Sequence, residues 1–143
     1  MASTTLRDHT TPILARVSRT RPLAVAGAVG AAVAVWVVAV PILGLHLIIQ
    51  FGSGSPESIG IDLVVGASLI ASLLGWGVLS LLETRSARGR AVWTVLAIAV
   101  LLVSLGLPLI AGVTVTTKIA LALMHVAVAA VLISTLPRSS TTR

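Results

Sequence analysis

Four long runs of apolar residues, separated by short polar links, organise the chain. The runs cover residues 22–45, 59–82, 91–113 and 117–136. At about 1.5 Å per residue, a helix of this length crosses the roughly 30 Å hydrocarbon core of a bilayer. The runs do not alternate polar and apolar residues, and they exceed the roughly 10 residues of a barrel strand. The pattern therefore predicts an all-α protein, a transmembrane four-helix bundle with no soluble domain.

Prolines and small polar residues mark where these helices begin and end. Residues 55–57 (Ser-Pro-Glu) predict the start of the second helix, with Ser as N-cap and Pro in the first turn. Thr114 or Thr116 can cap the fourth helix. Pro41 predicts a kink or an early end of the first helix, and Pro108 predicts the same for the third.

The two ends of the chain are polar. Residues 1–21 are rich in Thr and contain four Arg, which predicts a disordered or surface-lying tail. Pro22 follows the tail and is expected in the first turn of the first helix. Residues 137–143 form a second polar tail. The first apolar run is longer than the 7–15 residues typical of a cleaved signal peptide, so it is expected to remain as a span.

Basic residues collect on one side of the four runs. Four Arg precede the first run, three lie in the link over residues 83–90 and two follow the fourth run, whereas Lys118 alone lies on the other side. The positive-inside rule therefore predicts cytoplasmic amino and carboxyl termini (N-in, C-in). The chain has a net charge of +6, and its basic side would then face anionic membrane lipids, which are the expected partners. It does not indicate nucleic acid, because no aromatic or structured basic module accompanies it.

Residue usage narrows the chemistry and the source. The chain has no Cys, which excludes disulfides, thiolate metal sites and thiol catalysis. Arg outnumbers Lys nine to one, a bias of GC-rich genomes. We therefore expect an actinobacterial protein of the plasma membrane.

One ionisable side chain, His125, is expected near the middle of the bilayer. It lies about 11 residues, or roughly 16 Å, from the end of the fourth run, and Ser72 and Ser104 lie at a similar depth. Two interpretations are open. His125 forms an interhelical hydrogen bond with Ser72 or Ser104 that holds the bundle together, or these three residues form a ligand-binding site.

Metal or haem ligation is not expected. His46 lies at the far end of the first run, about 20 Å from His125 along the membrane normal, and His9 lies in the tail. These histidines cannot ligate one ion within a protomer. No cofactor is predicted.

Charged residues at the two membrane interfaces are candidates for ion pairs. Glu83 and Arg85 lie at the cytoplasmic end of the second run. Asp62 and Lys118 lie just inside the opposite interface and could pair across the second and fourth helices. Trp93 fits the cytoplasmic aromatic belt.

Small residues recur every four positions in the first two runs. They are Ala24, Ala28 and Ala32 in the first, and Ala67, Ala71 and Gly75 in the second. Such spacing permits close helix approach, within a protomer or between protomers.

The sequence lacks the motifs of an intramembrane enzyme. It has no Gly-rich phosphate loop, no Ser-His-Asp set expected to converge and no paired intramembrane carboxylates. We expect a non-enzymatic accessory or self-assembling membrane module, as a homo-oligomer or with a partner membrane protein. The alternative is a carrier or binder of a lipid, a quinone or another hydrophobic small molecule around His125.

Several short stretches carry a family resemblance: residues 81–85 (LLETR), 92–93 (VW), 102–108 (LVSLGLP), and 121–125 (LALMH) through 131–133 (VLI). In these the chain resembles a family of small four-span actinobacterial membrane proteins of unknown function. In the family pattern a proline often follows the last Leu-Ile, and in this chain that position is Ser134. The resemblance implies four helices and the same His position, and it implies no activity.

Overall fold

The protein is a multi-pass membrane protein. The computed structural model describes the backbone of residues 11–137 and the side chains of residues 21–137, so His9 and the tail after Pro137 lie outside the described residues. This part of the chain forms no soluble domain. Its four helical stretches long and apolar enough to cross a membrane are Arg21–Ile42, Ile61–Arg85, Gly89–Ala111 and Val115–Thr135.

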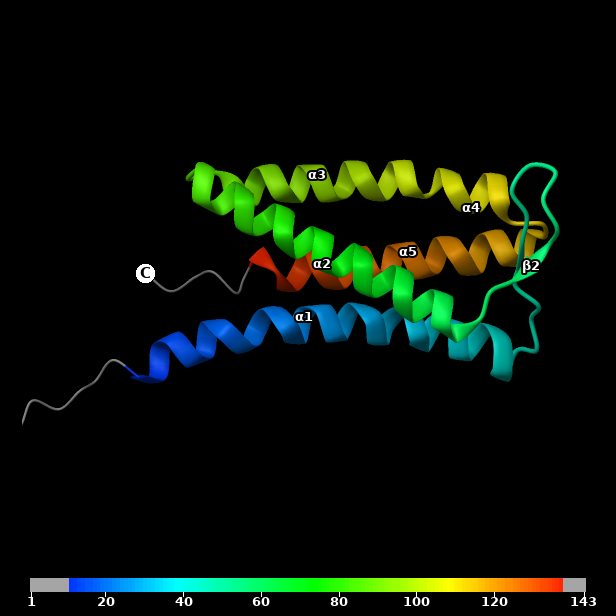
Figure 1. Cartoon of the computed structure of the whole chain (residues 1–143), viewed down its shortest axis with the longest axis horizontal. Coiled ribbons are helices and arrows are strands. Elements are labelled where there is room, and N and C mark those ends of the chain that lie inside the picture. Colours follow the sequence, from blue (N-terminus) through cyan, green and yellow to red (C-terminus); the bar gives the residue numbers. More distant parts are fainter. Residues whose placement is uncertain (1–10, 138–143) are drawn as a thin grey trace, which may run out of the picture.

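The helices form a bundle with two different ends. Helices α1, α3, α4 and α5 run roughly along the long axis, and α2 crosses them diagonally (Figure 1). One end, here the basic end, carries Arg21, Glu83, Arg85, Arg88 and Arg90, and the other, the hairpin end, carries the strands. The elements are α1 (Thr11–Val37), the π-helix η1 (Val38–Ile42), β1 (Ile48–Ile49), β2 (Glu57–Ser58), α2 (Ile61–Arg85), α3 (Gly89–Ser104), α4 (Gly106–Ala111) and α5 (Val115–Thr135).

Helix α1 begins earlier than the sequence pattern predicts. Residues 11–21, expected in the polar tail, are helical, and Pro22 lies inside the helix rather than in its first turn. Pro12 instead occupies the first turn, where its fixed φ and missing N–H cost least. Polarity alone therefore did not separate the tail from the helix.

Pro41 changes the helix type at the end of α1, as its position predicts. Its ring nitrogen cannot donate to the carbonyl of Val37. The backbone hydrogen bonds then span five residues instead of four and form the π-helix η1, in which the N–H of Leu43 donates to the oxygen of Val38 at 3.0 Å. Gly44 then ends the helix with a φ of +66°, a conformation that suits glycine.

The helix signals of the second half of the chain also act as predicted. Pro108 lies in α4 and has no N–H to donate to the carbonyl of Ser104. The third span is accordingly broken at Leu105, the next residue after Ser104. Thr114, rather than Thr116, caps α5, because its side-chain oxygen accepts from the N–H of Thr117 at 3.1 Å.

The start of α2 differs from the prediction. Glu57 and Ser58 do not open a helix but form β2, which pairs antiparallel with β1 in the register Ile48↔Ser58 and Ile49↔Glu57. Helix α2 begins at Ile61, with Gly60 as its N-cap. The hydrogen bonds of the strand pair thus replace the first helical turn that the Ser-Pro-Glu sequence favours.

The strands belong to a wider structure, the hairpin cap, made of residues 47–59 and 111–113. The N–H of Gln50 donates to the oxygen of Ala111 at 2.9 Å, and that of Val113 donates to Ile48 at 3.2 Å. The fully buried Thr117 hydroxyl accepts from the N–H of Ile48 at 3.4 Å. These bonds join the α1–α2 loop to the α4–α5 loop and satisfy backbone groups at the end of the spans.

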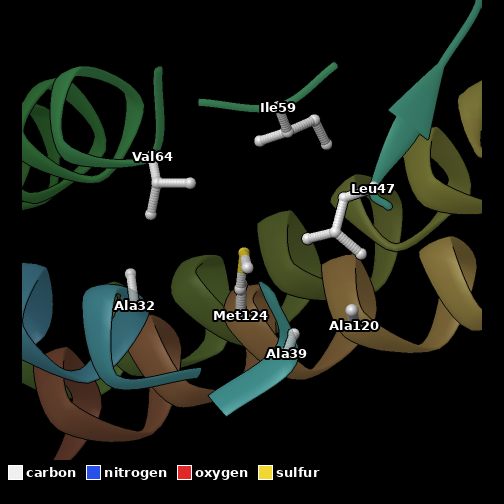
Figure 2. Packing of buried hydrophobic residues seen from close by; sticks show 7 residues of the cluster. All are labelled: Ala32, Ala39, Leu47, Ile59, Val64, Ala120 and Met124. Carbon is white, nitrogen blue, oxygen red and sulfur yellow. The ribbon is translucent and has the colours of Figure 1, made fainter. Parts of the chain in front are cut away.

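Two buried apolar clusters hold the bundle together. The cluster at the hairpin end contains residues from five elements, namely α1, η1, α2, α5 and the hairpin cap (Figure 2). Its members are Ala32, Ala39, Leu47, Ile59, Val64, Ala120 and Met124. The cluster at the basic end contains Ala24, Ala28, Leu79, Trp93, Leu132 and Leu136. The predicted small-residue face of α1 is therefore packed within the protomer.

The turn between α2 and α3 brings these two helices into close contact. A Cβ on the buried Gly89 would lie 2.5 Å from the oxygen of Leu82, so only glycine fits. One turn on, Trp93 is 3% exposed, and its indole N–H donates to the oxygen of Gly75 at 2.9 Å. Trp93 thus bridges α2 and α3 instead of lying in an aromatic belt as predicted. From this contact the two helices diverge toward the hairpin end (Figure 1).

Gly89→Ala is expected to destabilise the protein by about 1–3 kcal/mol, because the new methyl group overlaps the α2 backbone. Gly77→Ala is the matched control, since a Cβ there meets nothing within 4 Å. Thermal unfolding in detergent, followed by circular dichroism, measures both. Equal melting temperatures for the two variants would contradict the close contact.

Glu83 joins three helices at the basic end. Its carboxylate accepts from Arg21 of α1 at 2.7 Å and lies 3.7 Å from Arg90 of α3. Arg21 also donates to the hydroxyl of Ser80 at 3.0 Å. The sequence predicted Glu83 in an ion pair, and it forms one. Arg85 is not a partner in it, because residues two apart on a helix do not face each other.

Glu83→Gln is expected to lower stability by about 1 kcal/mol, because the pair with Arg21 is only about one-fifth exposed and ties α1 to α2. Arg85→Gln, at an exposed position of the same helix end, should change stability little. The comparison uses thermal unfolding at low and at high salt. If Arg85→Gln costs as much as Glu83→Gln, the Glu83 contacts do not connect the helices.

Candidate functional site

A cavity of about 680 Å³ lies inside the bundle. Its walls come from α2, α3, α4 and α5, and Ala32 of α1 also lines it. The lining contains no charged residue, and its polar side chains are Ser68, Trp93, Ser104 and His125. The cavity is thus an apolar space with a few polar groups, the usual character of a small-molecule site.

The cavity opens sideways. Residues that line it from α2, α3 and α4 are also exposed to the surroundings of the bundle, among them Leu74, Val100 and Leu107. Helices α2 and α3 diverge from their shared turn toward the hairpin end (Figure 1). The opening therefore faces the lateral surface, where a membrane protein meets lipid chains.

Both ends of the cavity are covered. Trp93 lines it toward the basic end, where α2 and α3 are in contact. Ile49 and Phe51 of the hairpin cap line it at the other end. Access from the bilayer is therefore more direct than access along the bundle axis.

His125 lines this cavity at the centre of α5. The helix spans Val115–Thr135, so His125 is equally far from both ends, about 15 Å. Its Nδ1 lies 2.8 Å from the carbonyl oxygen of Leu121. A carbonyl only accepts, so Nδ1 carries the proton and donates it within the same helix. The predicted interhelical bond from His125 to Ser72 or Ser104 is not formed.

Only one of the two predicted serines reaches the cavity. Ser104 lines it, whereas Ser72 is fully buried on α2 outside the lining and donates to the oxygen of Ser68 at 2.6 Å. Ser68 lines the cavity in place of Ser72 and was missed from the sequence. Its position one helical turn before Ser72 was the available signal, but the orientation of α2 determines which of the two faces the cavity.

The small residues of α2 shape the cavity. Ala67 and Ala71 were expected to allow close helix approach, but both are exposed and line the open space between α2 and α3. Gly75 meets Leu132 of α5 only at an ordinary contact distance of 3.9 Å. Small side chains here widen the cavity instead of drawing helices together.

Asp62 and Lys118 lie at the hairpin end as predicted, but they do not pair with each other. The two ion pairs among the described residues both involve Glu83. The carboxylate of Asp62 lies close over Gly60 at the start of its own helix, where the helix dipole favours negative charge. The stem of Lys118 lies against Gly112. Neither residue lines the cavity.

The described residues contain no candidate metal site. No group of three or more His, Asp or Glu side chains within that part of the chain could hold a metal ion. His46 is exposed in the segment before β1, and His125 lies at the middle of α5. The two thus lie on different elements of the fold.

Comparison with known proteins gives a family and no activity. The family model of DUF6069, a family of unknown function, matches residues 12–142. No curated protein and no solved structure matches the chain. Because the match covers nearly the whole chain, the protein belongs to DUF6069, a family of unknown function.

Proposed function

We propose that this protein binds an apolar small molecule, such as a lipid or a quinone-type compound, in the cavity around His125. The observation that carries the proposal is a cavity of about 680 Å³ that opens laterally and has a polar side chain at mid-span. Its volume lies within the roughly 300–1,000 Å³ typical of ligand pockets. An ionisable residue at this depth favours a functional site.

The lateral opening favours a ligand that arrives from the bilayer. Leucine and valine side chains of α2, α3 and α4 flank the opening, so a molecule dissolved in lipid can pass without crossing a polar surface. Its apolar surface stays in an apolar environment throughout, so no step exposes that surface to water. The protein would thus act as a carrier or binding protein. In support of this role over an enzymatic one, Ser104 and His125 of the lining bond to backbone carbonyls of their own helices and not to each other.

Self-association is a second candidate function, and one specific observation favours it. Ala26, Gly30 and Ala34 lie four residues apart on the exposed side of α1, and a Cβ at Gly30 would meet nothing within 4 Å. Such a stripe permits close approach of another helix in a membrane. A second copy of the chain or a partner membrane protein could dock there, making the protein an accessory module.

For the orientation, we propose that the basic end faces the cytoplasm of an actinobacterial cell and that the membrane is the plasma membrane. The support is the excess of Arg at this end, with Arg21, Arg85, Arg88 and Arg90 among the described residues. The hairpin end then faces outward. Anionic headgroups of the inner leaflet would interact with the basic end at about 1 kcal/mol per residue.

The orientation can be tested with single cysteines because the chain contains none. Ser55→Cys places a thiol in the exposed hairpin, and Ser86→Cys places one in the exposed α2–α3 turn. In intact cells, a membrane-impermeant maleimide should label Ser55→Cys only, and permeabilised cells should show both labelled. The reverse order of labelling would place the basic end outside.

The binding proposal is tested by filling the cavity. Ala71→Phe puts an aromatic ring into the open space between α2 and α3 and should displace a bound molecule. Ala99→Phe makes the same change at an exposed α3 position outside the lining. Native mass spectrometry of protein taken from its membrane in mild detergent should find a non-covalent adduct on wild type and on Ala99→Phe, but not on Ala71→Phe.

Two results would count against binding. One is wild-type protein that carries no adduct, and the other is an adduct that survives Ala71→Phe unchanged. The same spectra report the oligomeric state. A dimer that Gly30→Leu dissociates would support the self-association candidate independently of the cavity.

A further inference from the structure

We propose that the ligand of this cavity presents a hydrogen-bond donor, a hydroxyl or an N–H group, on an otherwise apolar body. The inference rests on the proposed binding function and adds the chemical class of the head group. It follows from a property common to the polar side chains of the lining. Each hydrogen that these side chains could donate is already given to a backbone carbonyl of α2, α3 or α5.

Two of these donors belong to rings. The indole N–H of Trp93 donates to the oxygen of Gly75 at 2.9 Å. The Nδ1–H of His125 donates to the oxygen of Leu121 at 2.8 Å. Indole has no acceptor to offer, whereas neutral imidazole retains Nε2, a good acceptor, at the distal side of the ring. The bonds of the described residues give this Nε2 no partner.

The serines show the same pattern. The hydroxyl of Ser68 donates to the oxygen of Val64 at 2.7 Å, and that of Ser104 donates to the oxygen of Leu101 at 2.8 Å. Each serine oxygen keeps lone pairs that can accept. Pro108, also in the lining, has no backbone N–H. The cavity therefore offers acceptors and no free side-chain donor.

An acceptor-only lining discriminates between head groups. A hydroxyl or N–H can donate to Nε2 of His125 or to a serine oxygen and replace the hydrogen bond that it lost on leaving water or the headgroup region. An ether, an ester or a ketone brings only acceptors and finds no donor. A carboxylate would also be desolvated beside lone pairs, which is costlier still. A quinol should thus be preferred to its quinone, and a fatty alcohol to its ester.

The acceptors lie at a defined depth. Ser68 follows the start of α2 at Ile61 by seven residues, and Ser104 precedes the end of the third span at Ala111 by seven. Both serines therefore lie about 10 Å from the hairpin end, and His125 lies about 5 Å deeper. A donor head group would sit in the half of the cavity nearer the hairpin cap, leaving the opening between α2 and α3 for its apolar chain.

The test compares two probes that differ only in the donor. ω-Bromododecanol and its methyl ether have the same chain and the same bromine, which quenches tryptophan fluorescence on contact. Trp36→Phe with Trp76→Phe leaves Trp93, in the cavity lining, as the single tryptophan. In detergent-purified protein, the alcohol should quench Trp93 saturably with an apparent affinity about five- to tenfold higher than the ether, the effect of one net hydrogen bond.

Variants assign the preference to the acceptors. His125→Leu should bring the alcohol down to the affinity of the ether, whereas Ser72→Ala, outside the lining, should keep the preference. If His125→Leu does not fold, Ser104→Ala provides the same test at a second acceptor. Equal, saturable binding of both probes would overturn the donor inference while supporting binding in the cavity. Absence of saturable quenching by either probe would overturn the proposed function and the inference together.

Discussion

The contact between α2 and α3 at Gly89 determines the internal shape of this bundle. Since Gly89 has no side chain, the start of α3 lies directly against the backbone of Leu82, and Trp93 fixes the pair one turn further on. Helices that begin in contact and cross at an angle must separate with distance (Figure 1). The cavity occupies this separation, with α5 behind it. Its existence is a consequence of the tight turn together with the diagonal path of α2.

The bilayer then decides where irregular backbone can lie. Unpaired N–H and C=O groups are costly in lipid, so helix breaks are tolerated only where partners are at hand. Pro41 and Pro108 both break their helices close to the hairpin end, next to the backbone hydrogen bonds of the hairpin cap. The same cap joins the two loops at the wide end of the cavity. It therefore fixes the α1–α2 loop against the α4–α5 loop and supplies hydrogen-bond partners for backbone groups near the helix breaks.

The predictions that succeeded depend on local chemistry. Four apolar runs predict four spans, and Pro41, Pro108 and Thr114 act through neighbours within one helical turn. The failures depend on contacts distant in sequence. The strand at Glu57 forms by pairing with β1, which is itself bonded to the α4–α5 loop, and Glu83 pairs with Arg21, 62 residues away. Ser68 lines the cavity in place of Ser72 because of the crossing direction of α2, which no periodicity specifies. Ala67 and Ala71 have a spacing that is equally compatible with a tight contact and with an open space.

The bonding of His125 bears on only one of the two interpretations that the sequence left open, the interhelical hydrogen bond. A histidine that holds a bundle together bonds to another helix, whereas this one gives its proton to Leu121 of its own helix. Within the described residues it therefore contributes no interhelical bond. The local bond instead lowers the cost of placing a polar ring at mid-span and fixes which nitrogen carries the proton. What remains is one well-defined acceptor in an apolar cavity that opens to lipid. A leucine would fill the position more cheaply if packing were the only requirement, and this cost of a polar ring is what the proposed ligand binding would explain.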